Sequence, residues 1–215
     1  EDTLWYILTV MGRNEKTGDL EMKGLYIGNG IECYDAACKL SLQVNFTMLT
    51  KAPSLTVAYM DPTEFHSTWL GNKAIYRTRM AMADRGTLIV LAPGVKQFGE
   101  DETVDKLIRK YGYAGTTRIL KQIETSKELQ DNLSAAAHMI HGSTEGRFNV
   151  IYCPGHLTKQ EIEGVGFQYA DLDKMLTKYD VKTLKDGWNK DEAGNEFYYI
   201  SNPALGLWAV PERFE

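Results

Sequence analysis

Residues 65–94 read FHSTWLGNKAIYRTRMAMADRGTLIVLAPG, and this stretch decides the fold that the sequence predicts. It opens with a polar turn, continues through an amphipathic stretch typical of a helix, and closes on an apolar strand that stops at Pro93-Gly94. A second short apolar run, SLTVAYM at residues 54–60, precedes it. Strand, helix and strand in this order predict a βαβ unit, and therefore a parallel sheet with a right-handed crossover.

The flanking sequence extends this unit in both directions. Residues 4–28 contain two β-rich runs around a turn-rich link and predict a hairpin, and residues 31–44 repeat apolar side chains at helical spacing. Residues 101–140 predict a layer of helices, and residues 148–155, FNVIYCPG, predict a third strand that also ends at Pro-Gly. A short helix, a short strand and another helix are expected next, and then a hairpin with an extended tail.

These elements predict an α/β protein. We expect a mainly parallel sheet with helices on both faces, preceded by a β-hairpin and followed by a short hairpin-like tail. The expected segments are a hairpin at 1–30, an α/β domain at 31–180, and an aromatic, turn-rich tail at 181–215. Because the chain starts with Glu1 and enters an apolar run at once, we expect a piece of a longer protein whose N-terminal half joins the hairpin.

Composition narrows the classes of partner and compartment. Of the 215 residues, 43% are hydrophobic, which suffices for a core. A net charge of −5 without a basic stripe argues against nucleic acid as a partner. No apolar run approaches the roughly 18 residues of a membrane span, and no secretory signal opens the chain. The cysteines (Cys33, Cys38, Cys153) have no metal-site spacing, which favours reduced thiols and a cytoplasmic protein.

The predicted strands end in loops that carry reactive side chains. Ligands of open parallel sheets bind beyond the carboxyl ends of the strands. The loops offer Asp61 and His66, then Pro93, Gly94 and Lys96, then Cys153, Gly155 and His156, with Lys73 on the helix after the first loop. From these we select His66, Trp69, Lys73 and Lys96, and as a weaker candidate His156, as a basic, partly aromatic edge suited to a carboxylate or a phosphate.

Plainer interpretations stay open for each candidate. Lys73 alone is as well explained as a solvated helix lysine, Trp69 as a core residue, and Lys96 as an exposed loop lysine. His156 is as well explained as a residue that only satisfies the amino end of a helix.

Other motifs argue against several classes of site. His138 and His141 lie three apart on a predicted helix, but no third ligand has suitable spacing, so we interpret them as core or surface histidines and predict no metal site. The sequence has no GxGxxG or GxxxxGK[ST] loop, which disfavours a self-contained nucleotide site and an NAD-dependent oxidoreductase. It has no GxSxG motif, which disfavours a serine hydrolase.

Residues 69–94 resemble the C-terminal half of the nickel-dependent lactate racemase family. In that family an aromatic-Gln-x-x-Lys helix precedes a Gly-Gly turn and an ILVAE-type strand. Here Trp69 stands at the aromatic position, Lys73 at the lysine, Arg85-Gly86 at the turn, and TLIVLAP at the strand. The order of elements over residues 4–180 fits the family as well.

This resemblance implies a function. Members of the family have two α/β domains with the active site between them, and a nickel-pincer nucleotide held by a lysine and a histidine of the N-terminal half. That half also supplies the acid/base histidines. The reaction moves a hydride from the α-carbon of a 2-hydroxy acid to the cofactor and back to the opposite face. The C-terminal lysine helps to hold the substrate, so the resemblance implies that Lys73 is catalytic and binds the carboxylate.

Two departures from the family pattern bear on the substrate. Leu70 stands where the family has Gln and cannot form a hydrogen bond, and the loop APGVKQFGED differs in length and brings Lys96. We therefore expect a larger polyhydroxy acid, such as a sugar acid, and no catalysis without the N-terminal domain of the same protein. The alternative is a non-catalytic ligand-binding or interaction domain, because a fold by itself implies no chemistry.

Overall fold

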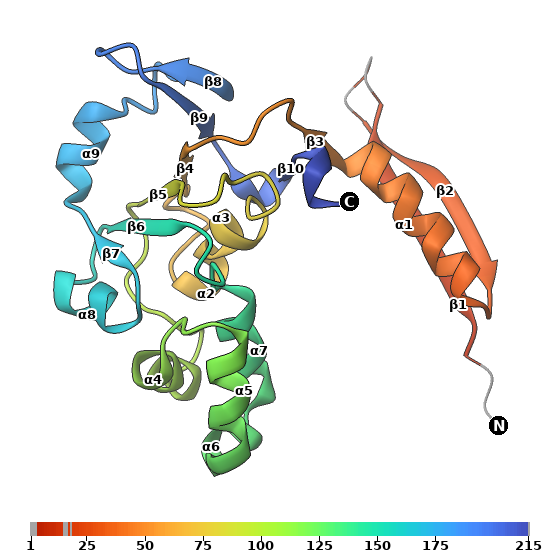
Figure 1. The fold of residues 1–215 in the computed structure, drawn as a ribbon, viewed down its shortest axis with the longest axis horizontal. Coiled ribbons are helices and arrows are strands. Elements are labelled where there is room, and N and C mark those ends of the chain that lie inside the picture. The colour runs from red at the N-terminus through yellow and green to blue at the C-terminus, as the bar shows by residue number, and fades with distance from the viewer. Residues whose placement is uncertain (1–3, 15–16, 18, 215) are drawn as a thin grey trace. The chain divides into compact units, whose positions relative to one another are not determined.

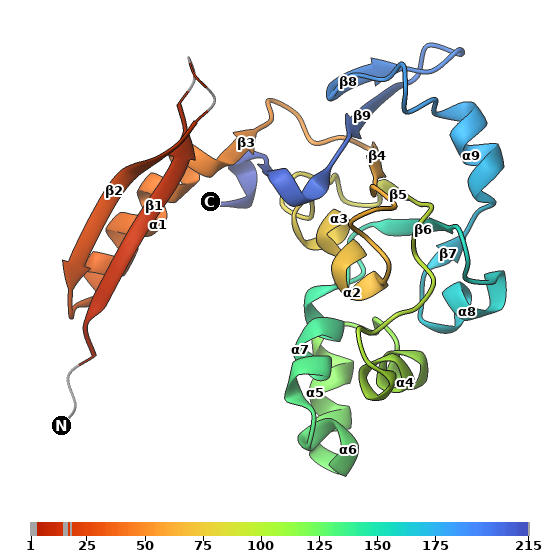
Figure 2. The same ribbon diagram turned by 180° about the vertical axis from the view of Figure 1, so that it is seen from behind.

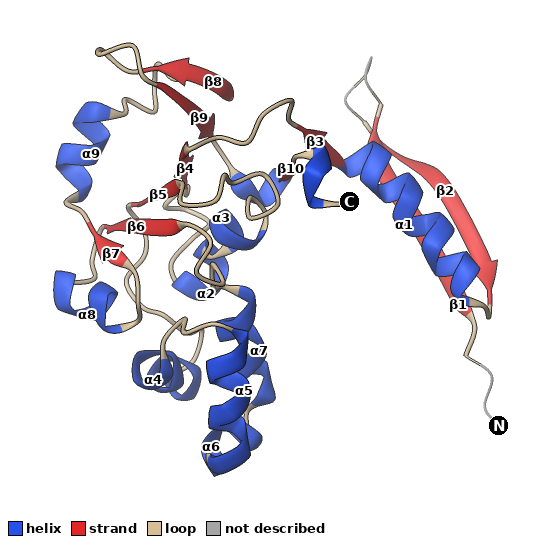
Figure 3. Cartoon of the chain, in the orientation of Figure 1, coloured by secondary structure: helices blue, strands red, loops and turns tan. Residues whose placement is uncertain are grey.

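The structure is a computed structural model that describes residues 4–14, 17 and 19–214. The chain divides into two compact units, Glu1–Thr47 and Met48–Glu215 (Figure 1). Figure 3 shows the helices and strands of both. We predicted a boundary at residue 30, whereas the chain divides after the helix that follows the hairpin. In the described residues, no helix combines the length and the apolar character that crossing a membrane requires.

The smaller unit is a hairpin with one helix on it. Strands β1 (Tyr6–Arg13) and β2 (Leu20–Gly28) pair antiparallel, as predicted, and α1 (Ile31–Asn45) packs along them. Glycines of the strands leave room for the helix, since a Cβ on Gly24 would lie 2.5 Å from Leu40 Cδ2. The predicted helix is therefore present, and it packs on the hairpin.

The larger unit contains a six-stranded sheet of order β7-β6-β5-β4-β9-β8. Every neighbouring pair is parallel except β8 and β9, which confirms the prediction of a mainly parallel sheet. The strands are β4 (Leu55–Tyr59), β5 (Thr87–Ala92), β6 (Asn149–Pro154), β7 (Gln168–Tyr169), β8 (Gly187–Lys190) and β9 (Glu196–Ile200). Two short strands lie outside it, β3 (Phe46–Met48) and β10 (Leu207–Ala209).

Helices cover both faces of this sheet, as predicted. One face packs into a large apolar cluster that includes Leu107, Ile119, Met139 and Ile162, and the other packs under α9 with Leu91 and Phe197. The helices are α2 (Thr68–Gly71), α3 (Lys73–Tyr76), α4 (Glu102–Tyr111), α5 (Thr116–Thr125), α6 (Lys127–Gln130), α7 (Leu133–His141), α8 (Lys159–Gly164) and α9 (Leu172–Lys178), with 3-10 turns η1 (Pro203–Leu205) and η2 (Pro211–Arg213).

The predicted tail at 181–215 is part of the sheet. Its hairpin is β8 and β9, and β9 pairs parallel with β4, with Thr56 opposite Tyr198. Residues 197–200, FYYI, are all buried, as befits an inner strand covered on both faces. The sequence suggested a tail because the partner of β9 lies about 140 residues earlier in the chain, where local patterning gives no signal.

We expect Phe197→Ala to lower the free energy of unfolding by about 3–5 kcal/mol, because the ring is 2% exposed and its removal leaves a cavity. Urea unfolding followed by circular dichroism measures this. Leu205→Ala is the matched control, because Leu205 is 76% exposed and its loss should change little. Equal effects of the two variants would contradict the placement of β9 inside the sheet.

Candidate functional site

The carboxyl ends of four parallel strands meet at one edge of the sheet. Because β9, β4, β5 and β6 run parallel as neighbours, the loops that leave them emerge side by side. Three of these loops contain the residues that the sequence nominated. The fourth, Ser201-Asn202 after β9, was missed because β9 was taken for part of a tail, and Asn202 Nδ2 donates to Glu64 Oε2 at 3.4 Å.

Main-chain hydrogen bonds join the loops after β4, β5 and β6. Lys96 N donates to His66 O at 2.9 Å, and His156 N donates to Val95 O at 3.2 Å. The two Pro-Gly strand ends allow this approach, because a Cβ on Gly94 would lie 2.8 Å from Pro62 O and one on Gly155 would lie 1.9 Å from Pro93 O. The edge is therefore held by backbone contacts that leave no room for a larger residue at either glycine.

Lys73 opens the short helix α3 at this edge. The expected single helix is two, because the buried Asn72 ends α2 and precedes α3. Lys73 Nζ lies 5.5 Å from the ring centroid of Phe65, a buried residue of the β4 loop. Lys73 is half-buried as a residue, and within residues 4–14, 17 and 19–214 no carboxylate lies within 4.0 Å of its ammonium group. Lys73 is thus a cation beside an apolar ring with no acidic partner there.

The structure separates the other candidates into two groups. His66 and Lys96 are exposed on neighbouring loops, and His156 is exposed on the next loop. Trp69 instead packs against the core and stacks on His138, with ring centroids 4.2 Å apart. The lysine and histidine candidates therefore lie on neighbouring segments of this edge, and the core interpretation describes the indole.

The Asp61 carboxylate is engaged in local hydrogen bonds, and the Cys153 thiol is buried. The Asp61 carboxylate accepts from Thr63 Oγ1 at 2.6 Å and Thr63 N at 2.8 Å, and these bonds hold its pKa below the usual range. Burial raises the pKa of the Cys153 thiol to about 12, so it stays protonated and is a poor nucleophile.

His138 belongs to a buried chain of hydrogen bonds. Its Nε2 lies 3.0 Å from Tyr113 Oη, which lies 2.8 Å from Thr68 Oγ1, and that hydroxyl donates to Phe98 O at 3.0 Å. Burial, with a smaller effect of His141, lowers the pKa of His138 to about 4, so the ring is neutral. His141 stacks on Tyr76 with centroids 4.1 Å apart. The two histidines are thus occupied in packing, as interpreted from the sequence.

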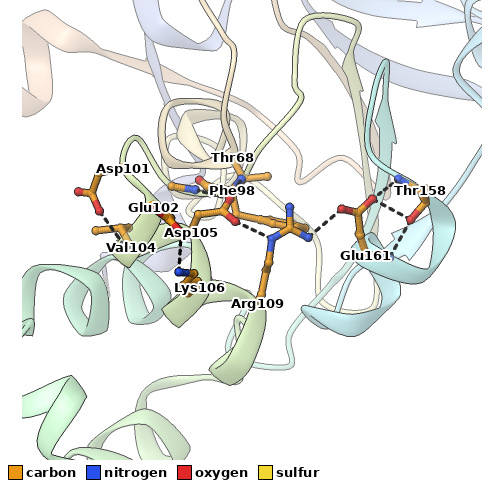
Figure 4. Close-up of polar contacts among 11 residues, drawn as sticks. Thr68, Phe98, Asp101, Glu102, Val104, Asp105, Lys106, Arg109, Thr158 and Glu161 are labelled. Atoms are coloured by element: carbon orange, nitrogen blue, oxygen red, sulfur yellow. Dashed lines mark hydrogen bonds and ion pairs between the residues drawn. The ribbon is translucent and has the colours of Figure 1, made fainter.

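A network of charged residues connects the β5 loop to the β6 loop (Figure 4). Asp105 accepts from Phe98 N at 2.6 Å and from Arg109 Nε at 2.5 Å, and Arg109 Nη1 donates to Glu161 Oε1 at 2.8 Å. Burial opposes ionisation of Asp105, but the hydrogen bonds from Arg109, Phe98 and Gly99 prevail and lower its pKa.

The far end of the network is a capping box at Thr158. Thr158 N and Oγ1 each donate to Glu161 Oε2 at 2.7 Å. This network was not predicted from the sequence, although two signals for it were present: the i, i+4 pair of Asp105 and Arg109, and the T-x-x-E spacing of Thr158 and Glu161.

A hollow of about 670 Å³ lies away from this edge. Its lining comes from the start of α5 and from the loop that enters β6, toward the amino ends of the strands. Glu145 Oε1 accepts from Thr116 N at 3.1 Å and from Thr116 Oγ1 at 2.9 Å, so the start of α5 already holds the protein's own carboxylate.

Two solved structures are similar to this chain. A crystal structure of a Thermotoga maritima protein matches with a TM-score of 0.64 and 22% identity, over 96% of this chain and 49% of that one. The lactate racemase apoprotein from Thermoanaerobacterium thermosaccharolyticum matches with a TM-score of 0.54 and 10% identity, over 87% of this chain and 42% of that one. The likeness is one of fold.

The chain spans about half the length of these proteins. No protein-family model matches the sequence, and no curated protein matches it by sequence comparison. The comparisons therefore show a similarity of fold alone.

We expect Gly155→Ala to lower the free energy of unfolding by about 1–3 kcal/mol, since the new methyl group meets the backbone oxygen of Pro93. Gly164→Ala is the matched control, because nothing lies within 4 Å of a Cβ there. Thermal unfolding measures both. A Gly155→Ala protein as stable as the control would show that the loops are not held by this contact.

We expect His138 to make the protein less stable as the pH falls from 6.5 to about 4. In this window the unfolded chain binds a proton at His138 that the folded protein does not bind, so stability is complete above pH 6.5 and is lost below it. The loss by pH 4 is about 3 kcal/mol, at 1.36 kcal/mol per pK unit. Urea unfolding across this range should give a shallower pH dependence for His138→Gln, whereas His156→Gln, at an exposed site, should match the wild type.

Proposed function

We propose that this chain is the C-terminal α/β half of a lactate-racemase-like enzyme that racemises or epimerises a 2-hydroxy acid, with Lys73 holding the substrate carboxylate. The observation that carries the proposal is the half-buried Lys73, whose ammonium group lies beside the Phe65 ring at the ligand edge and has no acidic partner among the described residues. The likeness to the lactate racemase apoprotein supports it at the level of fold.

The setting of Lys73 favours a carboxylate. The Phe65 ring lies beside the ammonium group, with its centroid 5.5 Å from Nζ, and is an apolar surface against which a bound anion would exclude water and interact more strongly. The hydrogen bonds between the β4 and β5 loops fix the backbone around it, so little ordering is needed when a substrate binds. A carboxylate held there would place the neighbouring carbinol carbon at a constant distance from the lysine.

The residues around Lys73 favour a substrate larger than lactate. Leu70, one turn before Lys73, packs against the core and offers no hydrogen bond. The exposed His66 and Lys96 on the adjoining loops supply polar groups farther along the edge. We therefore propose a sugar acid, such as an aldonate, whose hydroxyl groups can reach these side chains.

The nickel-pincer nucleotide that the family resemblance implies does not fit the described residues. No group of three His, Cys, Asp or Glu side chains that could hold a metal gathers in residues 4–14, 17 and 19–214. His138 is bonded to Tyr113, and Cys153 is protonated and buried. If the enzyme uses this cofactor, the N-terminal domain of the same protein must hold it, and we assign this chain only the role of binding and orienting the substrate.

We expect Lys73→Met to raise the KM for the hydroxy acid and to lower kcat/KM by about 10- to 100-fold, the effect of losing one charge-assisted hydrogen bond. The assay follows inversion of single-isomer lactate and aldonates by chiral chromatography, with the complete protein matured with nickel cofactor. Titration calorimetry of the same acids separates binding from turnover.

Lys121→Met is the matched control, because Lys121 is an exposed lysine of α5 that lines the hollow away from the edge. Unchanged binding and turnover in Lys73→Met would reject the role of Lys73. Acid binding that depends on Lys73 without any turnover would favour the alternative, a non-catalytic ligand-binding domain.

A further inference from the structure

One face of the hairpin carries exposed apolar side chains along both strands, interrupted on β1 by Thr9. Ile7 lies opposite Ile27, and Met11 lies opposite Met22. We call these residues, with the other exposed apolar residues of the same face on the two strands and just before β1, the hairpin face. Figure 2 shows the hairpin from the side that α1 does not cover. The hairpin face consists of Trp5 (62% exposed), Ile7 (72%), Met11 (37%), Leu20 (67%), Met22 (55%), Leu25 (53%) and Ile27 (61%).

A β-bulge keeps these side chains on one face. The register shifts between Val10 and Met11, where Gly24 pairs with Val10 but Met22 pairs with Met11, so Lys23 is the extra residue. Without it, Leu20 and Met22 would point toward α1 while Leu25 and Ile27 pointed away. The bulge therefore places the apolar side chains of both halves of β2 on the same face of the hairpin.

The opposite face cannot account for the stability of the unit. Among the described apolar residues of Glu1–Thr47, only Val10 and Ala37 are buried. A two-stranded hairpin under one helix has too small a core to be stable alone, and an element with an apolar face needs a second layer against it. A contiguous apolar face of this size marks a surface that another part of a protein covers.

The comparisons indicate what covers it. The match with the Thermotoga maritima protein takes in 96% of this chain, so it includes most of the hairpin unit, yet it spans 49% of that protein. The remaining half of that fold has no counterpart in these 215 residues. A domain of that size offers a surface large enough to cover seven side chains.

We propose that the hairpin face is the docking surface for a companion domain of the same polypeptide, outside residues 1–215, equivalent to the half of the Thermotoga maritima fold that the match leaves out. The proposal rests on the proposed function in one respect, because it assumes the same two-domain enzyme. It adds that the hairpin is the element through which this half attaches to the other, by apolar contact at Ile7, Met22, Leu25 and Ile27.

The test is site-specific photocrosslinking in the intact polypeptide encoded by the full reading frame. A benzophenone amino acid replaces Ile27, the protein is irradiated, and the crosslinked peptides are identified by mass spectrometry. We expect crosslinks to residues outside 1–215 of the same polypeptide. The matched control places the same group at Leu133, which is 60% exposed in the larger unit, and should give at least tenfold less of these crosslinks.

A second variant tests the apolar character of the contact. Ile7→Lys combined with Leu25→Glu keeps opposite charges near each other on the hairpin and should lower the Ile27 crosslink yield at least tenfold. Circular dichroism checks that the variant is folded. If it is not, the single change Met22→Lys at the far end of the face replaces it, with the same expected loss.

Three results would overturn the proposal: crosslinks between two copies of the chain, crosslinks confined to residues 48–214, or a reading frame that encodes no companion domain. None of these readouts requires turnover. If acid binding depends on Lys73 but the Ile27 crosslink does not form, the docking surface is rejected and the substrate role of Lys73 stands. If the crosslink forms but acid binding does not depend on Lys73, the substrate role is rejected and the docking surface stands.

Discussion

Close backbone contact between three neighbouring loops is the constraint on which the candidate site depends. Each of β5 and β6 ends at Pro-Gly. A side chain on the first glycine would meet the backbone of the β4 loop, and one on the second would meet the backbone of the β5 loop. Because main chain bonds to main chain there, the positions of His66, Lys96 and His156 are fixed relative to one another. Because backbone contacts hold the three loops, the polar side chains on them are free to contact a ligand and are not needed to stabilise the loops.

Two further layers support this frame from behind. The neutral chain from His138 through Tyr113 to Thr68 reaches the carbonyl of Phe98, and the charged network from Asp105 through Arg109 reaches Glu161. Both act on the β5 loop, one from its buried side and one from its outer side. Burial explains the difference in their electrostatics: His138 gives up its charge, whereas Asp105 keeps its charge because it is bonded to a guanidinium group and to backbone amides.

The two units of the chain differ in how much of their apolar surface they bury. The larger unit buries its apolar residues on both faces of a parallel sheet. The hairpin buries one face under α1 and leaves its other face exposed, although that face is the more apolar. The hydrophobic effect stabilises the first arrangement within the unit itself and leaves the second in need of another surface.

The sequence by itself determined the local elements and the parallel sheet, because apolar runs of strand length, helical spacing and Pro-Gly stops are written in neighbouring residues. It also placed His66 and Lys96 on loops that follow the strands, and Lys73 on the helix after the first of these loops. Only the tertiary structure decided that residues 31–45 cover the hairpin, that β9 lies beside β4, that Trp69 turns inward onto His138, and that Arg109 joins two loops. These depend on contacts between residues far apart in the chain, whose free energy comes from packing and burial and leaves no pattern in adjacent letters.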